Sequence, residues 1–408
     1  MSLLVLALLL GFAWYVMKPE ERSRVIETVL GASRYLPTAV KYAKHAAAPG
    51  YPEPEPFLAA LNARTPRALV TPAIVALNVT VFAGMIVGAG SIGDPETLVR
   101  WGASFGPRTT NGEWTRLLTS MFVHAGPLHL VVSLAALVHL GFVMERLVGH
   151  VAFAAVYVAA GTVASLVSLS NHPIEVSAGA SGAVFGIYGL LVATSIWGLL
   201  QRSPLTIPVS TLKNLAPPAA LFFLYNAVTE GLGGGAELSG LIVGFACGLL
   251  FARSVADRKP PARQVAAAMA ATLVIVAGSA VPLRGLTDVR PEIERALGIE
   301  DRTAGTYRAA VEQFRYGNIT ADGLADLIDR KIVPEISAVR ARLKALGRVP
   351  EEHRPLVDEV EEYLRLRDES WRLRSEALHR NDMNTLRKAD RAERASLDAF
   401  ERLKPVDR

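Results

Sequence analysis

Cysteine is nearly absent from this chain of 408 residues, which contains one, Cys247. A single thiol excludes an intrachain disulfide and any metal site built from several cysteines. No internal repeat of 20–50 residues is found, which excludes the repeat architectures. Neither sign of charge dominates, because the formal net charge is only +5 and the charged tail is rich in acids as well as bases. We therefore expect no nucleic-acid partner, no metal and no cofactor.

Apolar sequence, in contrast, is abundant. Hydrophobic residues make up 51% of the chain, which is high for a soluble protein and indicates several membrane spans plus a polar part. Runs of about 17–25 apolar residues suit a bilayer, and one of the expected runs, 217–228, is shorter. The predicted spans after the N-terminal region are 68–87, 117–143, 151–169, 181–200, 217–228, 236–252 and 264–283.

The first 17 residues form another apolar run, with no basic residue before it and Lys18 and Arg22 after it. A secretory signal would carry its positive charge in front, so we predict an uncleaved membrane anchor at 1–17 with its N-terminus outside. Residues 18–63 are predicted to be a basic cytoplasmic segment and a proline-rich linker. Basic residues between later spans alternate sides consistently, which predicts a multi-pass plasma-membrane protein with both termini outside.

From residue 284 onward the sequence becomes charged and favours helices. Leu356, Val360 and Leu364 recur at helical spacing, and a second helix is predicted at 384–403. This pattern predicts a soluble helical hairpin or small bundle, a candidate binding site for an unidentified protein partner. The expected domains are therefore the anchor 1–17, the segment 18–63, a membrane core 64–253, an additional transmembrane helix 264–283 and a soluble helical domain 284–408.

Ser181 lies where a polar, turn-prone loop meets an apolar helix that continues to Leu200. A serine at that boundary can reach water while its helix crosses the bilayer. Gly179 and Gly182 carry no side chains beside the hydroxyl, so another backbone can approach it. From this stretch alone, the glycines are equally consistent with a plain helix-packing face on which Ser181 is one small residue.

Three further stretches bear on Ser181. The first, residues 112–129, places two histidines at the outer end of a span, where ionisable groups are functional candidates. The second is the Glu145–Arg146 pair, and the third is the glycine-rich segment 235–244. Together with the Gly-x-Ser-Gly motif, these stretches resemble the rhomboid family of intramembrane serine proteases over residues 64–253. The resemblance implies an all-α membrane protein with a six-helix core, here with an extra helix before it and another after it.

The resemblance also implies roles for individual residues. Ser181 corresponds to the nucleophile, and His129 to an oxyanion-hole donor beside the backbone N–H of Ser181. The other assignments are packing glycines at Gly179, Gly182, Gly240 and Gly244, an oxyanion position at Ser133, and structural roles for Trp114, Arg116, His124, Glu145 and Arg146. The implied ligands are transmembrane helices of substrates or clients within the lipid bilayer.

The chain departs from the family pattern at two of these positions. Glu237 occupies the place of the family's catalytic histidine, and Ser133 that of an asparagine. A serine nucleophile needs a partner that takes its proton and later returns it, which imidazole does well near neutral pH. An ionised glutamate is a weak base for an alcohol, and a protonated one is no base at all. His139, deeper in its span, is read as a buried, hydrogen-bonded histidine and not as a replacement.

Two functions of different classes follow. One is a client-binding rhomboid-like protein in which proteolysis is impaired or lost. The other is an active intramembrane endopeptidase that uses a Ser181–Glu237 pair. A transport or channel role around Glu237 is a third, weaker option, since no broken-helix pair or inverted repeat is found.

Overall fold

A computed structural model describes residues 54–88, 92–200, 207–229, 235–253, 255 and 258–403. The chain forms two compact units, Met1–Arg284 and Gly285–Arg408. The predicted anchor at 1–17 and most of the basic segment lie outside the described residues. Within the predicted linker, helix α4 (Pro54–Arg64) buries Phe57 and Leu61 in the core of the first unit.

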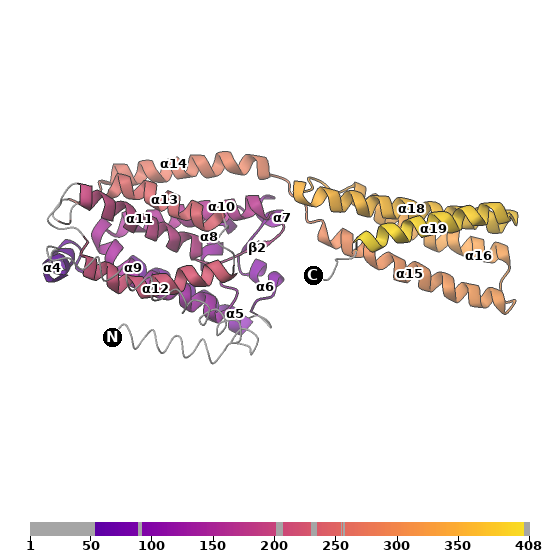
Figure 1. Cartoon of the computed structure of the whole chain (residues 1–408), viewed down its shortest axis with the longest axis horizontal. Helices are drawn as coiled ribbons and strands as arrows, with labels where there is room; N and C mark the ends of the chain where they lie inside the picture. Colours follow the sequence, from indigo (N-terminus) through magenta and orange to yellow (C-terminus); the bar gives the residue numbers. More distant parts are fainter. Residues whose placement is uncertain are drawn as a thin grey trace, which may run out of the picture. The chain divides into compact units, whose positions relative to one another are not determined.

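The first unit is built almost entirely of helices (Figure 1). Within the described residues its sheet is one antiparallel pair, β1 (Ser104–Phe105) with β2 (Val176–Ser177). The long helices are α5 (Val70–Gly88), α9 (Pro127–Val148), α10 (His150–Asn171), α11 (Ser181–Leu200), α12 (Val209–Thr229), α13 (Gly235–Phe251) and α14 (Ala262–Ala280). The short helices are α6 (Pro95–Arg100), α7 (Gly106–Thr109), α8 (Arg116–Thr119) and the 3₁₀ turns η1 (Ser120–Phe122) and η2 (Val281–Leu283).

Five of the described helices are long and apolar enough to cross a membrane, namely α5, α9, α10, α11 and, with its following turn, α14. Helix α13 is equally apolar but has 17 residues, and α12 has 21 residues with a lower hydropathy. The predicted all-α, polytopic membrane fold is confirmed. Helices α5 and α9 to α13 correspond to the six helices predicted for the core, and α14 corresponds to the predicted additional helix.

Three span boundaries differ from the prediction, one of them the end of the third span, which lies at Val148 and not near residue 143. The third span begins at Pro127 and not near residue 117, because 116–122 form α8 and η1 and Pro127 starts the helix where a missing N–H costs nothing. The sixth helix begins at Val209 and not near Pro217. Both Pro217 and Pro218 lie inside α12, as membrane helices tolerate when their neighbours compensate the lost hydrogen bond.

Helices α11 and α13 touch backbone to backbone through their glycines. A methyl group on Gly240 would lie 2.2 Å from the carbonyl oxygen of Gly182, and one on Gly244 would lie 1.8 Å from that of Gly186. The contact continues to Gly248, which faces Leu190 and Ala193. The two helices therefore run parallel, with their N-termini at the same end. Without a hydrophobic driving force in lipid, such close packing is a main source of helix association.

The second unit is a bundle of amphipathic helices. Its buried side chains form one apolar core that includes Ile299, Ile336, Val360, Leu364 and Trp371. The elements are α15 (Arg290–Arg315), α16 (Ala321–Leu327), the π-helical turn η3 (Ile328–Ile332), α17 (Val333–Lys344), the 3₁₀ turn η4 (Glu351–His353), α18 (Arg354–Arg380) and α19 (Met383–Leu403).

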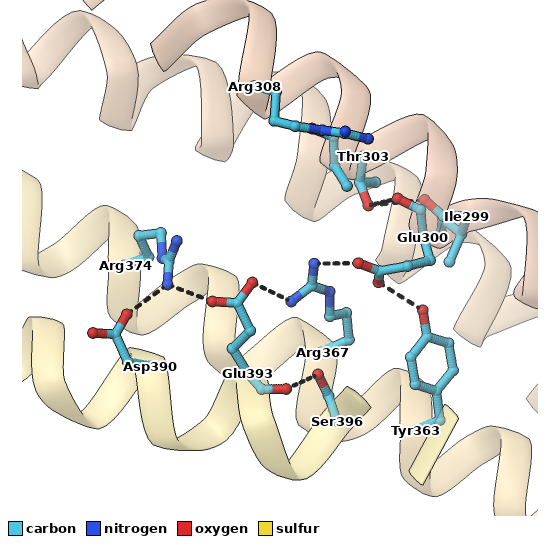
Figure 2. Close-up of polar contacts among 11 residues, drawn as sticks. Ile299, Glu300, Thr303, Arg308, Tyr363, Arg367, Arg374, Asp390, Glu393 and Ser396 are labelled. Carbon is cyan, nitrogen blue, oxygen red and sulfur yellow. Dashed lines mark hydrogen bonds and ion pairs between the residues drawn. The ribbon is translucent and has the colours of Figure 1, made fainter. Parts of the chain in front are cut away.

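A buried arginine links three of these helices (Figure 2). The guanidinium of Arg367 on α18, 2% exposed, donates to Glu300 on α15 at 2.6 Å and to Glu393 on α19 at 3.0 Å. Arg374 donates to Glu393 and to Asp390, both at 2.7 Å. These contacts place each carboxylate opposite a cation, which fixes the register of the helices.

Tyr363 completes this network by donating its hydroxyl hydrogen to Glu300 at 3.0 Å (Figure 2). Burial, together with the neighbouring Glu300 carboxylate, raises the pKa of Tyr363. The hydroxyl therefore stays protonated and remains a donor over the whole physiological pH range.

We expect Gly244→Ala to destabilise the membrane unit by about 1–3 kcal/mol, because the new methyl group would overlap the Gly186 carbonyl. Gly278→Ala in α14 is the matched control, since nothing lies within 4 Å of its added methyl group. That control should change stability by less than about 1 kcal/mol. Thermal unfolding of both variants in detergent makes the comparison, and equal losses would contradict the assigned helix contact.

We expect Arg367→Met to destabilise the second unit by about 3–5 kcal/mol, because it removes the cation from Glu300 and leaves Glu393 with Arg374 alone. Arg365 on the same helix pairs with exposed Glu362 and Glu369. Arg365→Met should therefore cost less than about 1 kcal/mol. Hydrogen exchange of α15, α18 and α19 in the two variants measures the difference, and similar protection in both would contradict it.

Candidate functional site

A polar cavity of about 480 Å³ opens where the N-termini of α11 and α13 meet the C-terminus of α10. Its volume lies in the range of small-ligand sites. Both Ser181 and Glu237 line it. Its other polar lining residues are Ser120, Ser165, Ser168, Asn171, His172, Glu175, Ser177 and Thr229.

Ser181 is the first residue of α11, and the chain before it is held in place on two sides. Strand β2 pairs with β1, with Ser177 opposite Ser104. Beyond the strand, the backbone N–H of Gly179 donates to the carbonyl of Ser120 at 2.9 Å. Because these contacts fix the loop, the Ser181 side chain is presented at the cavity wall, where it is 8% exposed.

Glu237 lies in the first turn of α13, at nearly the same height as Ser181. It precedes Gly240 by three residues, or about 4.5 Å along the axis, while Ser181 precedes Gly182 by about 1.5 Å. Gly240 and Gly182 are in contact, so the two side chains face one cavity. The Oε2 atom of Glu237 is buried and has no hydrogen-bond partner, and its carboxylate forms no ion pair or hydrogen bond with a described residue, Ser181 included.

His129 lies in the first turn of α9, with its ring against the backbone of Gly179. A methyl group on Gly179 would lie 2.5 Å from the ring's Cε1 atom, and the φ of +130° at this residue also favours glycine. The ring packs edge-on to His124, with centroids 4.9 Å apart. The Nε2 atom of His129 is buried without a partner among the described residues. The ring therefore lies beside the backbone of the Gly-x-Ser-Gly motif.

Ser133 follows His129 by one turn of α9. Its side chain is 1% exposed, and its Oγ atom has no hydrogen-bond partner among the described residues. Neither His129 nor Ser133 is among the residues that line the cavity. Both ring nitrogens of His124 are also buried.

Glu145 on α9 binds the N-terminus of α5. Its carboxylate accepts the backbone N–H groups of Leu69, Val70 and Thr71 at 2.6–2.7 Å, and it also contacts the Nδ1 atom of His150 at 2.6 Å. A carboxylate at a helix N-terminus satisfies N–H groups that have no partner within the helix. This arrangement clamps α5 against α9.

Arg146 and Arg116 tie further segments to this core. The Arg146 guanidinium donates to the side chain of Asn62 on α4 at 2.5 Å. The buried Arg116 donates to the backbone carbonyls of Val99 and Ala103 and pairs with the Glu113 carboxylate at 2.5 Å. Trp114 packs with Leu117, Leu166, Leu169 and, on and after α14, Val276, Ala280 and Leu283.

The hydroxyl-rich wall on α10 was missed by the sequence analysis. Ser165 and Ser168 line the cavity, and Ser165 shares a hydrogen bond of 3.2 Å with Ser120. The signal was available, because Ser165, Ser168 and Asn171 recur every three residues in an apolar helix and so share one face. His139 lies away from this wall and bonds the carbonyl of Ala135 in its own helix at 2.8 Å.

His172 and Glu175, in the loop after α10, were also missed. The Nδ1 atom of His172 lies 3.9 Å from a Glu175 carboxylate oxygen, and their side chains are 59% and 73% exposed. The pair therefore forms the mouth of the cavity. Within the described residues, no group of three or more histidine, cysteine or acidic side chains could hold a metal ion.

Residues 111–254 match the sequence pattern of the Rhomboid domain. Among curated relatives, rhomboid protease GluP of Bacillus subtilis is 38% identical over 122 residues, which is 30% of this chain and 24% of that protein. Rhomboid-like protease 3 of Toxoplasma gondii is 29% identical over 46% of this chain and 72% of its own. RHOMBOID-like protein 7 of Arabidopsis thaliana is 29% identical over a region that covers 38% of this chain and 48% of that protein. The match to the first of these spans about a quarter of that relative.

We expect Gly179→Ala to destabilise the membrane unit by about 1–3 kcal/mol more than Gly112→Ala does. Both glycines have a positive φ, +130° and +121°, so both substitutions strain the backbone. At Gly179 the methyl group also meets the His129 ring, whereas nothing lies within 4 Å at Gly112. Thermal unfolding of the two variants measures the difference in stability that is due to the His129 contact. Equal losses of stability in both variants would contradict that contact.

Proposed function

The chain belongs to the rhomboid family through its residues 111–254, and on that premise we propose that it binds transmembrane segments of client proteins at the cavity beside Ser181, with proteolysis impaired or lost. Ser181 keeps the position of the nucleophile, and His129 that of an oxyanion donor. Glu237 stands where the family has its histidine base. The protein then acts on its clients by holding them and not by cutting them.

The observation that carries this proposal is the Glu237 carboxylate in the same cavity as Ser181. Activation of a serine hydroxyl needs a group that accepts its proton and returns it to the leaving amine. The Glu237 carboxylate forms no hydrogen bond with Ser181, so it is not in position to take the proton of the hydroxyl. On this proposal the chain keeps the position of the nucleophile and lacks the family's base.

His172 does not supply the missing imidazole. Helix α10 contacts α11 at Ala164, where a methyl group on Gly182 would lie 2.3 Å from the Ala164 Cβ atom. His172 follows Ala164 by eight residues, or about 12 Å along the helix axis. A general base has to reach the hydroxyl at about 2.6–3.2 Å, or through one water. The histidine at the mouth is therefore too far along α10 for direct contact.

The alternative is an active protease that uses a Ser181–Glu237 pair. The shared height of the two residues and their common cavity favour it, because a carboxylate within reach of a hydroxyl can act as a general base when its pKa is tuned. Ser133 would then serve as a weaker oxyanion donor than the family's asparagine. One lost donor at such a site costs about 2.7–4 kcal/mol.

The same proposal places the protein in the plasma membrane, with both termini and the Ser181 cavity on the outer side. The support is the distribution of basic residues, since Arg146 and Arg253 follow spans on the opposite side from Ser181. The C-terminal bundle would then lie outside the cell, available to an unidentified protein partner.

We expect the wild-type protein to cleave a reporter transmembrane segment at background rate and Glu237→His to raise the rate by about 10²–10⁴-fold, the usual contribution of a general base. Cleavage of the reporter in proteoliposomes is the measurement. Adding Ser181→Ala to Glu237→His should return the rate to background. Labelling of Ser181 by a fluorophosphonate probe should likewise be stronger in Glu237→His than in the wild type, and it should be lost when Ser181→Ala is added.

Glu237→Gln is the matched control, because it removes the charge and keeps the shape. Under the binding proposal it cleaves no less than the wild type. If the wild type cleaves and Glu237→Gln does not, the alternative holds and the binding proposal fails. Cross-linking of the reporter to the wild type measures binding directly, and its absence would contradict the proposal independently of cleavage.

A further inference from the structure

We propose that the cavity beside Ser181 accepts a lysine or arginine side chain of the bound client, which pairs with Glu237. The inference rests on the proposed client binding and names the chemistry that selects the client. Its basis is a buried carboxylate oxygen without a partner inside a cavity large enough to hold one.

The charges around the cavity are unbalanced. Two carboxylates, Glu175 and Glu237, are among the described residues that line it, and none of those residues is a lysine or an arginine. Among the same described residues, His172, which lies 3.9 Å from Glu175, is the one that can become cationic. An acidic mouth above an acidic interior concentrates cations along the path into the cavity.

Glu237 has no paired cation among the described residues, unlike the other described carboxylates that have a buried oxygen without a hydrogen-bond partner. Those are Glu292 and Asp368, and each pairs through its second oxygen with an arginine, Arg295 and Arg372 respectively. Burying a carboxylate without a cation or donors is costly. Glu237 has no such partner among the described residues, so a binding partner can supply one.

The remaining lining suits the head of a basic side chain. A guanidinium has five N–H donors and an ammonium has three, and a carboxylate satisfies only some of them. The hydroxyls of Ser165, Ser168 and Ser181 line the same space and can accept the others. Arginine fits better than lysine, because its planar fork binds a carboxylate through two parallel hydrogen bonds.

Glu237 cannot turn away from the cavity by moving its helix. Gly240, one turn later, has its backbone against the Gly182 carbonyl, and Gly244 has the same contact with Gly186. The position of the carboxylate is therefore set by the α11–α13 contact, which gives a preformed site and not one that assembles around the client.

The test uses the full chain in nanodiscs of neutral lipid and three fluorescent leucine–alanine transmembrane peptides. The peptides differ at one position near the polar end, which is arginine, glutamine or glutamate. We expect the arginine peptide to bind about ten-fold tighter than the glutamine peptide, a modest value for a partly buried charge pair. The glutamate peptide should bind most weakly.

Glu237→Gln should abolish the preference for arginine, and Glu237→Lys should reverse it in favour of glutamate. The reversal guards against a variant that has merely lost its fold, because a misfolded protein gains no new preference. Glu96→Gln is the matched control, since it removes an exposed carboxylate of the same unit away from the cavity. It should keep the ten-fold preference.

Equal binding of all three peptides would overturn this inference while leaving client binding intact. A preference that persists in Glu237→Gln would overturn it too, because the selecting charge would lie elsewhere. Failure of every peptide to bind would overturn both the inference and the proposed function.

Discussion

The glycine contact between α11 and α13 is the constraint on which the rest of the membrane unit depends. Gly182 and Gly186 on one helix meet Gly240 and Gly244 on the other at distances that leave no room for a methyl group. Parallel helices in such close contact must keep their N-termini level. Ser181 and Glu237, each near the start of its helix, are consequently held in one cavity by backbone packing and not by any bond between their side chains.

Because backbone packing sets the position of these residues, the cavity can keep its shape whichever side chain stands at position 237. Gly179, the His129 ring and the β1–β2 pair position the loop before Ser181 without involving residue 237. Glu145 and Arg116 hold α5 and the 95–103 region through backbone groups that are equally independent of it. A carboxylate can therefore replace an imidazole without disturbing the surrounding fold, although the proton chemistry of the two groups differs.

Much of the fold could be predicted from the sequence, because membrane helices are marked by long apolar runs. The ranges of α10, α11 and α13 were predicted to within two residues. The predicted helix boundaries were wrong where tertiary contacts compensate for polar or helix-breaking residues. Arg116 is buried because distant carbonyls accept its hydrogens, and Pro217 and Pro218 stay helical within α12. The motifs pointed to Ser181 and Glu237, which line one cavity. The spacing of Ser165 and Ser168 shows that they share a helix face, but only the packing of α10 shows that this face lines the cavity.

The two units differ in how their carboxylates are paired. In the C-terminal bundle, Arg367 places a cation between Glu300 and Glu393, so both of these carboxylates are paired and the pairs fix the register of the helices. In the membrane unit, Glu145 accepts three backbone N–H groups and a histidine. Glu237 has neither kind of partner among the described residues. This difference supports the proposed pairing of Glu237 with a basic side chain of a bound client, because an unpaired carboxylate oxygen in a cavity of ligand size lowers stability until a cation reaches it.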